Sequence, residues 1–127
     1  KIMITTIRLG EKDVPMRASA LTAVIYRSMF GKDLTVELNK MRKTRENNES
    51  GLDIFKQLAF VMNWQSLPRD TKITEAMKNL SIDDYYEWLD EVEEADFFEG
   101  ETLSAITSLW VNSQKSQIPL KNVANPQ

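Results

Sequence analysis

The side chains of this sequence that could do chemistry are mostly carboxylates, because its 127 residues include neither cysteine nor histidine. Their absence excludes thiolate nucleophiles, imidazole bases and the usual nitrogen and sulfur ligands of zinc and copper. Ten of the 19 acidic residues fall within residues 83–101, a segment without lysine or arginine that we call the acidic stretch. The role of this stretch is the first question that the sequence raises.

Two kinds of carboxylate chemistry fit the acidic stretch poorly. An EF-hand calcium loop needs a glycine turn at its centre, whereas residues 83–94 carry aromatic residues and leucine there. A carboxylate acid and base pair needs two carboxyl groups about 5 to 10 Å apart across a cleft, and acids at helical spacing on one exposed face form no cleft. We therefore expect a protein that is not an enzyme, with no catalytic residue, no metal and no cofactor.

Aromatic residues accompany the acids. Five of the chain's eleven aromatic residues lie in the acidic stretch, namely Tyr85, Tyr86, Trp88, Phe97 and Phe98. In one interpretation they belong to the core, and the acids keep the surface soluble. In the other, some of them form an exposed anchor with an acidic rim, suited to a partner helix with basic flanks. The partner-binding residues predicted on this second basis are Tyr86, Trp88, Phe97, Phe98 and Trp110.

The formal charge of −3 combines two halves of opposite sign. Residues 1–45 carry a net charge of +6, and residues 46–127 carry a net charge of −9. The basic cluster at residues 40–45 is too small for a nucleic-acid footprint, which needs many phosphate contacts, and no apolar run approaches the roughly 18 residues of a membrane span. We expect a soluble, cytoplasmic protein that binds neither nucleic acid nor membrane, and whose opposite charges permit weak head-to-tail homo-oligomers.

The first 31 residues predict a β-hairpin followed by a helix. Short apolar and β-branched strands over residues 2–8 and 14–17 flank a polar loop that contains Gly10. Ser19 is placed to cap the following helix, and Gly31 is placed to end it. The residues expected to face the core from this helix are Leu21, Val24, Ile25 and Met29.

The rest of the chain predicts further helices. Asp33 can cap the second one, which fades into a polar loop at residues 43–50. Ser50 and Asp53 resemble a capping box at the start of a long, broadly apolar central helix. The remaining helical segments are expected to begin near Ile73, Ser81 and Glu101.

Together these elements predict an α+β fold that is predominantly α-helical, with an N-terminal β-hairpin packed on a bundle of five to six helices. One globular domain is expected over residues 1–116, with the hairpin in 1–17 and the helices in 19–116. Residues 117–127 contain two prolines and no periodicity, so we expect a flexible C-terminal tail.

Three segments of the sequence carry motifs that occur in the same order in a known protein family. They are the hairpin Ile4-Thr-Thr-Ile-Arg-Leu-Gly-Glu-Lys-Asp-Val-Pro-Met-Arg17, the helix end Tyr26-Arg-Ser-Met-Phe-Gly-Lys-Asp-Leu34 and the helical segment Leu58-Ala-Phe-Val-Met62. In this order the chain resembles the tail assembly chaperones of long-tailed bacteriophages and prophages. The resemblance covers roughly residues 2–110, and its motifs are structural rather than catalytic.

The resemblance implies a non-enzymatic protein that binds the long helical tape-measure protein and promotes assembly of tail-tube subunits around it. Its partners would be the tape-measure protein and the tail-tube protein, in the host cytoplasm, and it would be absent from the mature virion. The residues leave an alternative open, a small acidic helical regulator or inhibitor that binds a basic surface of another protein. A tape-measure gene just downstream would favour the chaperone, whereas tight, salt-sensitive binding to a DNA-binding protein would favour the regulator.

Overall fold

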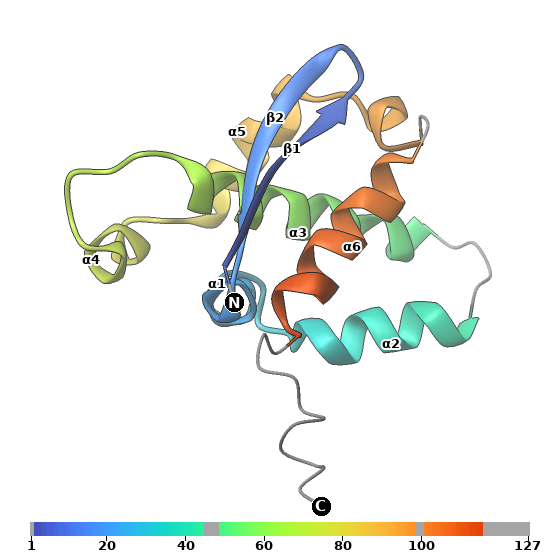
Figure 1. The fold of residues 1–127 in the computed structure, drawn as a ribbon, viewed down its shortest axis with the longest axis horizontal. Helices are drawn as coiled ribbons and strands as arrows, with labels where there is room; N and C mark the ends of the chain where they lie inside the picture. The colour runs from blue at the N-terminus through green and yellow to red at the C-terminus, as the bar shows by residue number, and fades with distance from the viewer. Residues whose placement is uncertain (1, 45–48, 99–100, 116–127) are drawn as a thin grey trace, which may run out of the picture.

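The structure is a computed structural model and describes residues 2–44, 49–98 and 101–115. Within these residues the chain forms a two-stranded antiparallel hairpin, six α-helices and one short 3-10 helix, η1 (Figure 1). The elements in chain order are β1 Met3–Leu9, β2 Lys12–Ala18, α1 Ala20–Phe30, α2 Leu34–Thr44, α3 Glu49–Ser66, α4 Ile73–Lys78, α5 Ile82–Glu91, η1 Glu94–Phe98 and α6 Thr102–Ser113. The predicted α+β, mainly α-helical fold is confirmed. None of the described helices is both long and apolar enough to cross a membrane.

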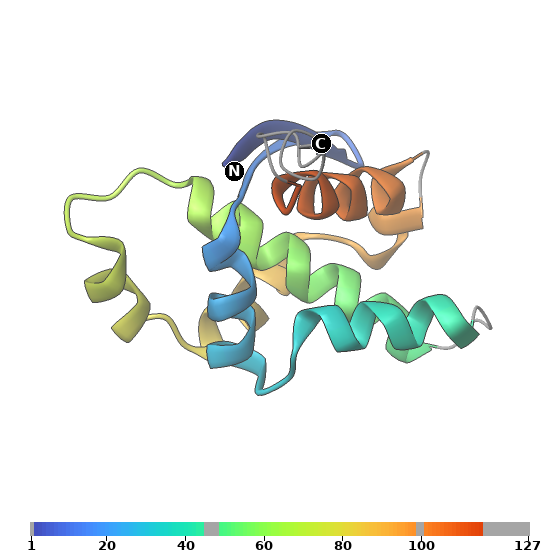
Figure 2. The same cartoon turned by 60° about the horizontal axis from the view of Figure 1, so that its bottom comes forward.

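Helix α3 is the centre of the fold. It contacts β2, α1, α2, α5 and α6, and two views show these elements arranged around it, with α4 set apart (Figures 1 and 2). Its buried residues are Ile54, Phe55, Leu58, Ala59, Phe60, Val61, Met62 and Gln65. A helix with so wide an apolar surface must touch several neighbours at once, and the prediction of a central helix is confirmed.

The hairpin rests on α3 and α6 with one face toward the core. Its buried side chains are Ile7, Leu9, Met16 and Ala18. At one edge, the Thr102 hydroxyl of α6 donates to the carbonyl of Arg8 at 3.0 Å. At the other edge, the Asn63 amide of α3 donates to the carbonyl of Pro15 at 2.9 Å. Because two strands alone are marginally stable in water, these contacts and the shared core stabilise the hairpin.

The hairpin turn is tighter than predicted. The strands extend to Leu9 and resume at Lys12, which pair with each other, so only Gly10 and Glu11 lie between them where a five-residue loop was expected. Gly10 has φ of 65°, a backbone region that glycine adopts at little cost. A two-residue turn of this kind fixes the register of the two strands.

Helix α1 has the predicted ends but buries a different face. Ser19 caps the helix, and Gly31 ends it with φ of 71°. The prediction that Val24 faces the core is wrong, because Val24 is exposed and Thr22 is fully buried instead. The Thr22 hydroxyl donates to the Gln65 side-chain oxygen and accepts from the Ser19 N–H. A polar side chain can be buried there because both of its hydrogen-bonding roles are satisfied.

The polar segment 43–50 is not a single loop. Helix α2 continues to Thr44, and α3 already begins at Glu49. The predicted capping box at Ser50 is therefore wrong, since Ser50 lies inside α3 rather than before it. The predicted segments that fall outside the described residues are 45–48 and 117–127.

Candidate protein-interaction surface

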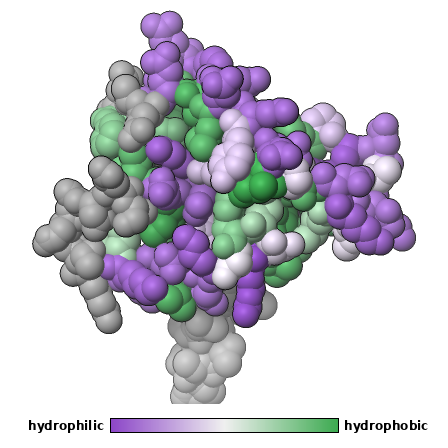
Figure 3. All heavy atoms as spheres, turned by 180° about the vertical axis from the view of Figure 1, so that it is seen from behind, coloured by the Kyte–Doolittle hydropathy of each residue, from purple (hydrophilic) through white to green (hydrophobic). Residues whose placement is uncertain are grey.

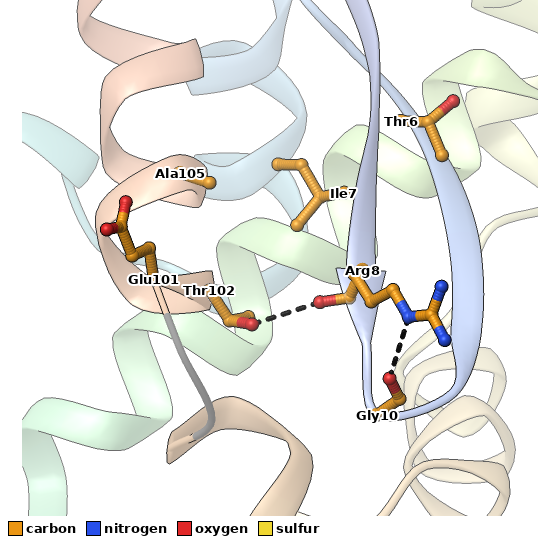
Figure 4. A pocket seen from close by; sticks show the side chains of 7 residues that line it. All are labelled: Thr6, Ile7, Arg8, Gly10, Glu101, Thr102 and Ala105. Atoms are coloured by element: carbon orange, nitrogen blue, oxygen red, sulfur yellow. Dashed lines mark hydrogen bonds between the residues drawn. The ribbon is translucent and has the colours of Figure 1, made fainter.

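A hollow of about 410 Å³ lies between β1 and the start of α6 (Figure 4). The Arg8 side chain at its edge donates from Nε to the carbonyl of Gly10 at 3.1 Å and pairs with Asp13 at 3.4 Å. The Thr102 hydroxyl donates to the Arg8 carbonyl, and Glu101 is the one carboxylate among the described residues that line the hollow. These residues join the hairpin to α6.

The acids of α5 do not converge on one point. The helix carries five acidic residues, all exposed, namely Asp83, Asp84, Glu87, Asp90 and Glu91. Across residues 2–44, 49–98 and 101–115, no group of three or more carboxylates is placed to hold a metal ion. In the same part of the chain, every buried side-chain nitrogen or oxygen has a hydrogen-bond partner. The acids of α5 thus form a charged surface rather than an enclosed site.

Helix α5 is anchored by its inner face. Its start is capped, as predicted, because the Ser81 N–H donates to the Asp84 carboxylate at 2.9 Å. Tyr85 is buried and meets Phe30 and Phe60 edge to face, with ring centroids 5.1 and 5.4 Å away. Such aromatic pairs add to the stabilisation from burial alone. With Tyr85 held inside, the opposite face of α5 is left to solvent.

The five predicted partner-binding residues fall into different environments. Tyr86 and Phe98 are exposed, by 58% and 65% respectively. Trp88 is half-buried against the core. Phe97 and Trp110 are only 1% and 5% exposed, and Trp110 presents its small accessible part to a groove between α2 and α6. The prediction is therefore corrected for Phe97, which belongs to the core, whereas Tyr86 and Phe98 are accessible and Trp88 and Trp110 are accessible only in part.

Tyr86 stands in a shallow acidic surface on α5. Asp83, Glu87 and Asp90 line the same depression, and Ile82 is 39% exposed. Ile82 and Tyr86 are four residues apart, which places them on the same side of the helix. We call these five residues the α5 surface, in which two apolar side chains have an acidic border.

A second surface is a groove of about 260 Å³ between α2 and α6, of whose lining the sequence analysis had singled out Trp110 alone. Its lining residues are Thr35, Leu38, Asn39, Met41, Thr107, Trp110 and Val111. Val111 is apolar and yet 42% exposed. The available signal was the position of Val111 directly after the inward-facing Trp110, outside the predicted core face of the last helix.

Burial keeps two tyrosines protonated. Removal from water, followed by the nearby charges of Glu37 and Asp53, raises the pKa of Tyr26 to about 12. Burial is also the main cause that raises the pKa of Tyr85. The Tyr26 hydroxyl donates to the Gln57 side-chain oxygen at 2.8 Å. Both phenols are therefore neutral at neutral pH, and that of Tyr26 serves as a hydrogen-bond donor.

We expect the free energy of unfolding to fall as the pH rises above 10. Phenols of the unfolded chain ionise near pH 10, whereas folded Tyr26 stays protonated up to about pH 12. The unfolded state then binds fewer protons than the folded state, so alkali favours unfolding. Urea unfolding at a series of pH values between 8 and 12 measures the effect. The Tyr26→Phe variant should decline less steeply than the wild type, and an equal decline would show that Tyr26 is not responsible.

The α5 surface and the α2–α6 groove are the two candidate binding surfaces. Each combines apolar side chains with polar or charged ones at its border, as protein interfaces do. Seen from behind, the molecule also exposes hydrophobic residues in small patches between hydrophilic ones (Figure 3). Comparison with protein-family models, curated proteins and solved structures finds no match for this chain.

Proposed function

We propose that this chain is a tail assembly chaperone of a long-tailed bacteriophage or prophage. It binds the tape-measure protein, helps tail-tube subunits assemble around it and acts in the host cytoplasm without entering the mature virion. Support comes from the segments of residues 2–110 that resemble this family. A hairpin packed on a helical bundle agrees with the order of elements in that family.

The observation that carries this proposal is the exposed ring of Tyr86 on an acidic helix. Helix α5 has five acidic residues and no basic one, and among the described α-helices Tyr86 is the one aromatic residue with an exposed ring. A tape-measure protein presents amphipathic helices, and one with basic flanks could cover the Tyr86 ring while its charges face the carboxylates. A contact of this kind is small and partly electrostatic, which suits a chaperone that is later displaced.

Tyr86→Ala is expected to weaken binding of the tape-measure protein about tenfold, which corresponds to about 1.4 kcal/mol. The thermal midpoint should stay nearly unchanged, because the ring is exposed. Binding is measured by co-purification and by titration of the tape-measure protein with the chaperone. Phe98→Ala tests the second accessible ring in the same way.

Val24→Ala is the matched control, since Val24 is also apolar and exposed but lies on α1. It should bind like the wild type. If Tyr86→Ala binds as tightly as the wild type, the assigned surface is wrong. If the wild type itself does not bind a tape-measure protein, and no tape-measure gene lies near its own gene, the proposed function is wrong.

A further inference from the structure

The outer edge of β1 has backbone groups directed away from the hairpin. In an antiparallel pair, successive residues of a strand turn their N–H and C=O groups alternately toward the partner strand and away from it. Thr6 pairs with Pro15, which has no N–H and whose carbonyl accepts from Asn63 of α3, so this pair exchanges no hydrogen bonds across the hairpin. The backbone groups of Thr6 therefore point away from β2, and by the same alternation so do those of Ile2 and Ile4. We call these three residues the β1 edge.

The described helices leave the β1 edge uncovered. Further along the strand, the outward carbonyl of Arg8 already accepts from α6. Among the described residues, no hydrogen bond from outside the hairpin reaches the backbone of Ile4 or Thr6. Thr5 is on the core side of the strand and is still exposed, and a hollow of about 410 Å³ lies beside Thr6 (Figure 4). A further strand therefore has room beside residues 2–6.

The opposite edge of the hairpin is protected, and the β1 edge is not. On β2, Pro15 offers no N–H, and its carbonyl accepts from two side chains of α3. Proline and a covering helix are two means by which proteins prevent a strand edge from pairing. Residues 2–6 contain no proline and no charged residue, and Ile2 and Ile4 are 55% and 65% exposed. An exposed apolar edge of this kind favours pairing with another strand.

We infer that the β1 edge binds the β1 edge of a second copy of this chain, antiparallel and around a two-fold axis. The outward residues Ile2, Ile4 and Thr6 are centred on Ile4. Pairing the two edges about this centre sets Ile4 opposite Ile4 of the second copy, and Ile2 opposite Thr6. Each of these pairs exchanges both of its backbone hydrogen bonds. The two hairpins thereby become one four-stranded sheet.

The edge itself argues for a second copy as its partner. Residues 2–6 are already extended in the folded hairpin, so no disordered chain loses entropy when they pair. Isoleucine and threonine favour strands, and cross-strand pairs of β-branched side chains stabilise a sheet. Two identical edges without charged residues meet with no like charges opposite each other. The register cannot shift toward Arg8, because its carbonyl is already bound.

The contact closes at the dimer. Both copies use the same surface, so the pair leaves no free β1 edge for a third copy. Its attraction comes from backbone hydrogen bonds and apolar side chains, so added salt should not weaken it. The head-to-tail oligomers expected from the opposite charges of the two halves of the sequence would instead grow, and would dissociate in salt. The inference does not depend on the proposed function, because Tyr86 and Phe98 take no part in this contact.

A charge at position 4 tests the two-fold axis. Ile4→Lys and Ile4→Glu each set two like charges opposite each other, so each variant alone should stay monomeric, whereas an equal mixture of the two should form a dimer. Ile4 is 65% exposed, so both variants should fold, which circular dichroism checks. Sedimentation velocity at rising protein concentration measures the mass. Val24→Lys, at an exposed valine of α1, should dimerise like the wild type.

A cross-link tests the register. The chain has no cysteine, so a single introduced thiol can bond only to a thiol of another copy. Residues directly opposite each other have Cα atoms about 5.5 Å apart, within reach of a disulfide. Under mild oxidation, Ile4→Cys should cross-link at least about tenfold faster than Ile2→Cys or Val24→Cys. A mixture of Ile2→Cys and Thr6→Cys should also cross-link fast, because these positions lie opposite each other.

Four results would overturn the inference. A wild type that stays monomeric at every concentration would leave the edge unpaired. Dimers that persist in Ile4→Lys alone, or equal cross-linking of Ile4→Cys and Ile2→Cys, would place the contact on another surface. A mixture of Ile4→Lys and Ile4→Glu that forms no dimer would remove the two-fold axis from Ile4. An assembly that grows past the dimer and dissociates in salt would be the head-to-tail one. No readout uses the tape-measure protein, so failure here is distinguishable from failure of the proposed function.

Discussion

Phe97→Ala should lower the free energy of unfolding by about 3 to 5 kcal/mol, the range observed when a buried aromatic ring is deleted. Phe97 is 1% exposed and meets Trp88 edge to face, with ring centroids 6.4 Å apart. Its ring fixes the end of the acidic stretch to the core, and its removal leaves a cavity between elements that cannot fully collapse. Urea unfolding followed by tryptophan fluorescence measures the loss.

Phe98→Ala is the matched control, because Phe98 is the same residue type at the next position of η1 and is 65% exposed. We expect it to change stability by less than about 0.5 kcal/mol. Similar losses in both variants would contradict the assignment of one ring to the core and the other to the surface. The pair also separates stability from binding, since only the Phe98 ring is accessible to a partner.

Three helix ends were predicted correctly from a single capping residue in the sequence. Ser19, Gly31 and Ser81 all act at the predicted positions, because a cap satisfies backbone groups within its own turn. Ser50 shows the limit of such signals. The same pattern of serine and an acid three residues later occurs there, yet Ser50 is already the second residue of α3. The length of α3 depends on its packing against several elements, which a local pattern does not contain.

Exposure was harder to predict than secondary structure. Tyr85 is buried while Tyr86 is exposed, and Phe97 is buried while Phe98 is exposed. Neighbours point about 100° apart on an α-helix and about 120° apart on a 3-10 helix. One member of each pair therefore faces inward, but which one depends on where α3 and the hairpin lie. The α2–α6 groove was invisible for the same reason, since its walls are distant in sequence and meet only in the folded chain.

Gly10→Ala should lower the free energy of unfolding by about 2 kcal/mol or more. A positive φ costs a residue with a side chain about 1 to 2 kcal/mol, and Gly10 has φ of 65°. A methyl group at this position would also overlap the carboxylate of Asp96, which accepts from the Glu93 N–H at 3.3 Å. The same turn is held by Lys12, whose ammonium donates to the carbonyl of Glu91 at 3.5 Å.

Gly31→Ala is the matched control for the cost of a positive φ alone, because Gly31 has φ of 71° and an added methyl group would meet no atom within 4 Å. It should cost about 1 kcal/mol, less than Gly10→Ala. Gly10→Ala should destabilise the fold more than Gly31→Ala does, because of the overlap with the Asp96 carboxylate. In the Asp96→Ala background this extra destabilisation should shrink by about 1 kcal/mol, the coupling that a double-mutant cycle measures. Urea unfolding of the four proteins of the cycle gives this coupling. Equal costs at the two glycines, or no coupling to Asp96, would mean that the hairpin tip does not press on the acidic stretch, and that the stretch is positioned by Phe97 and the core alone.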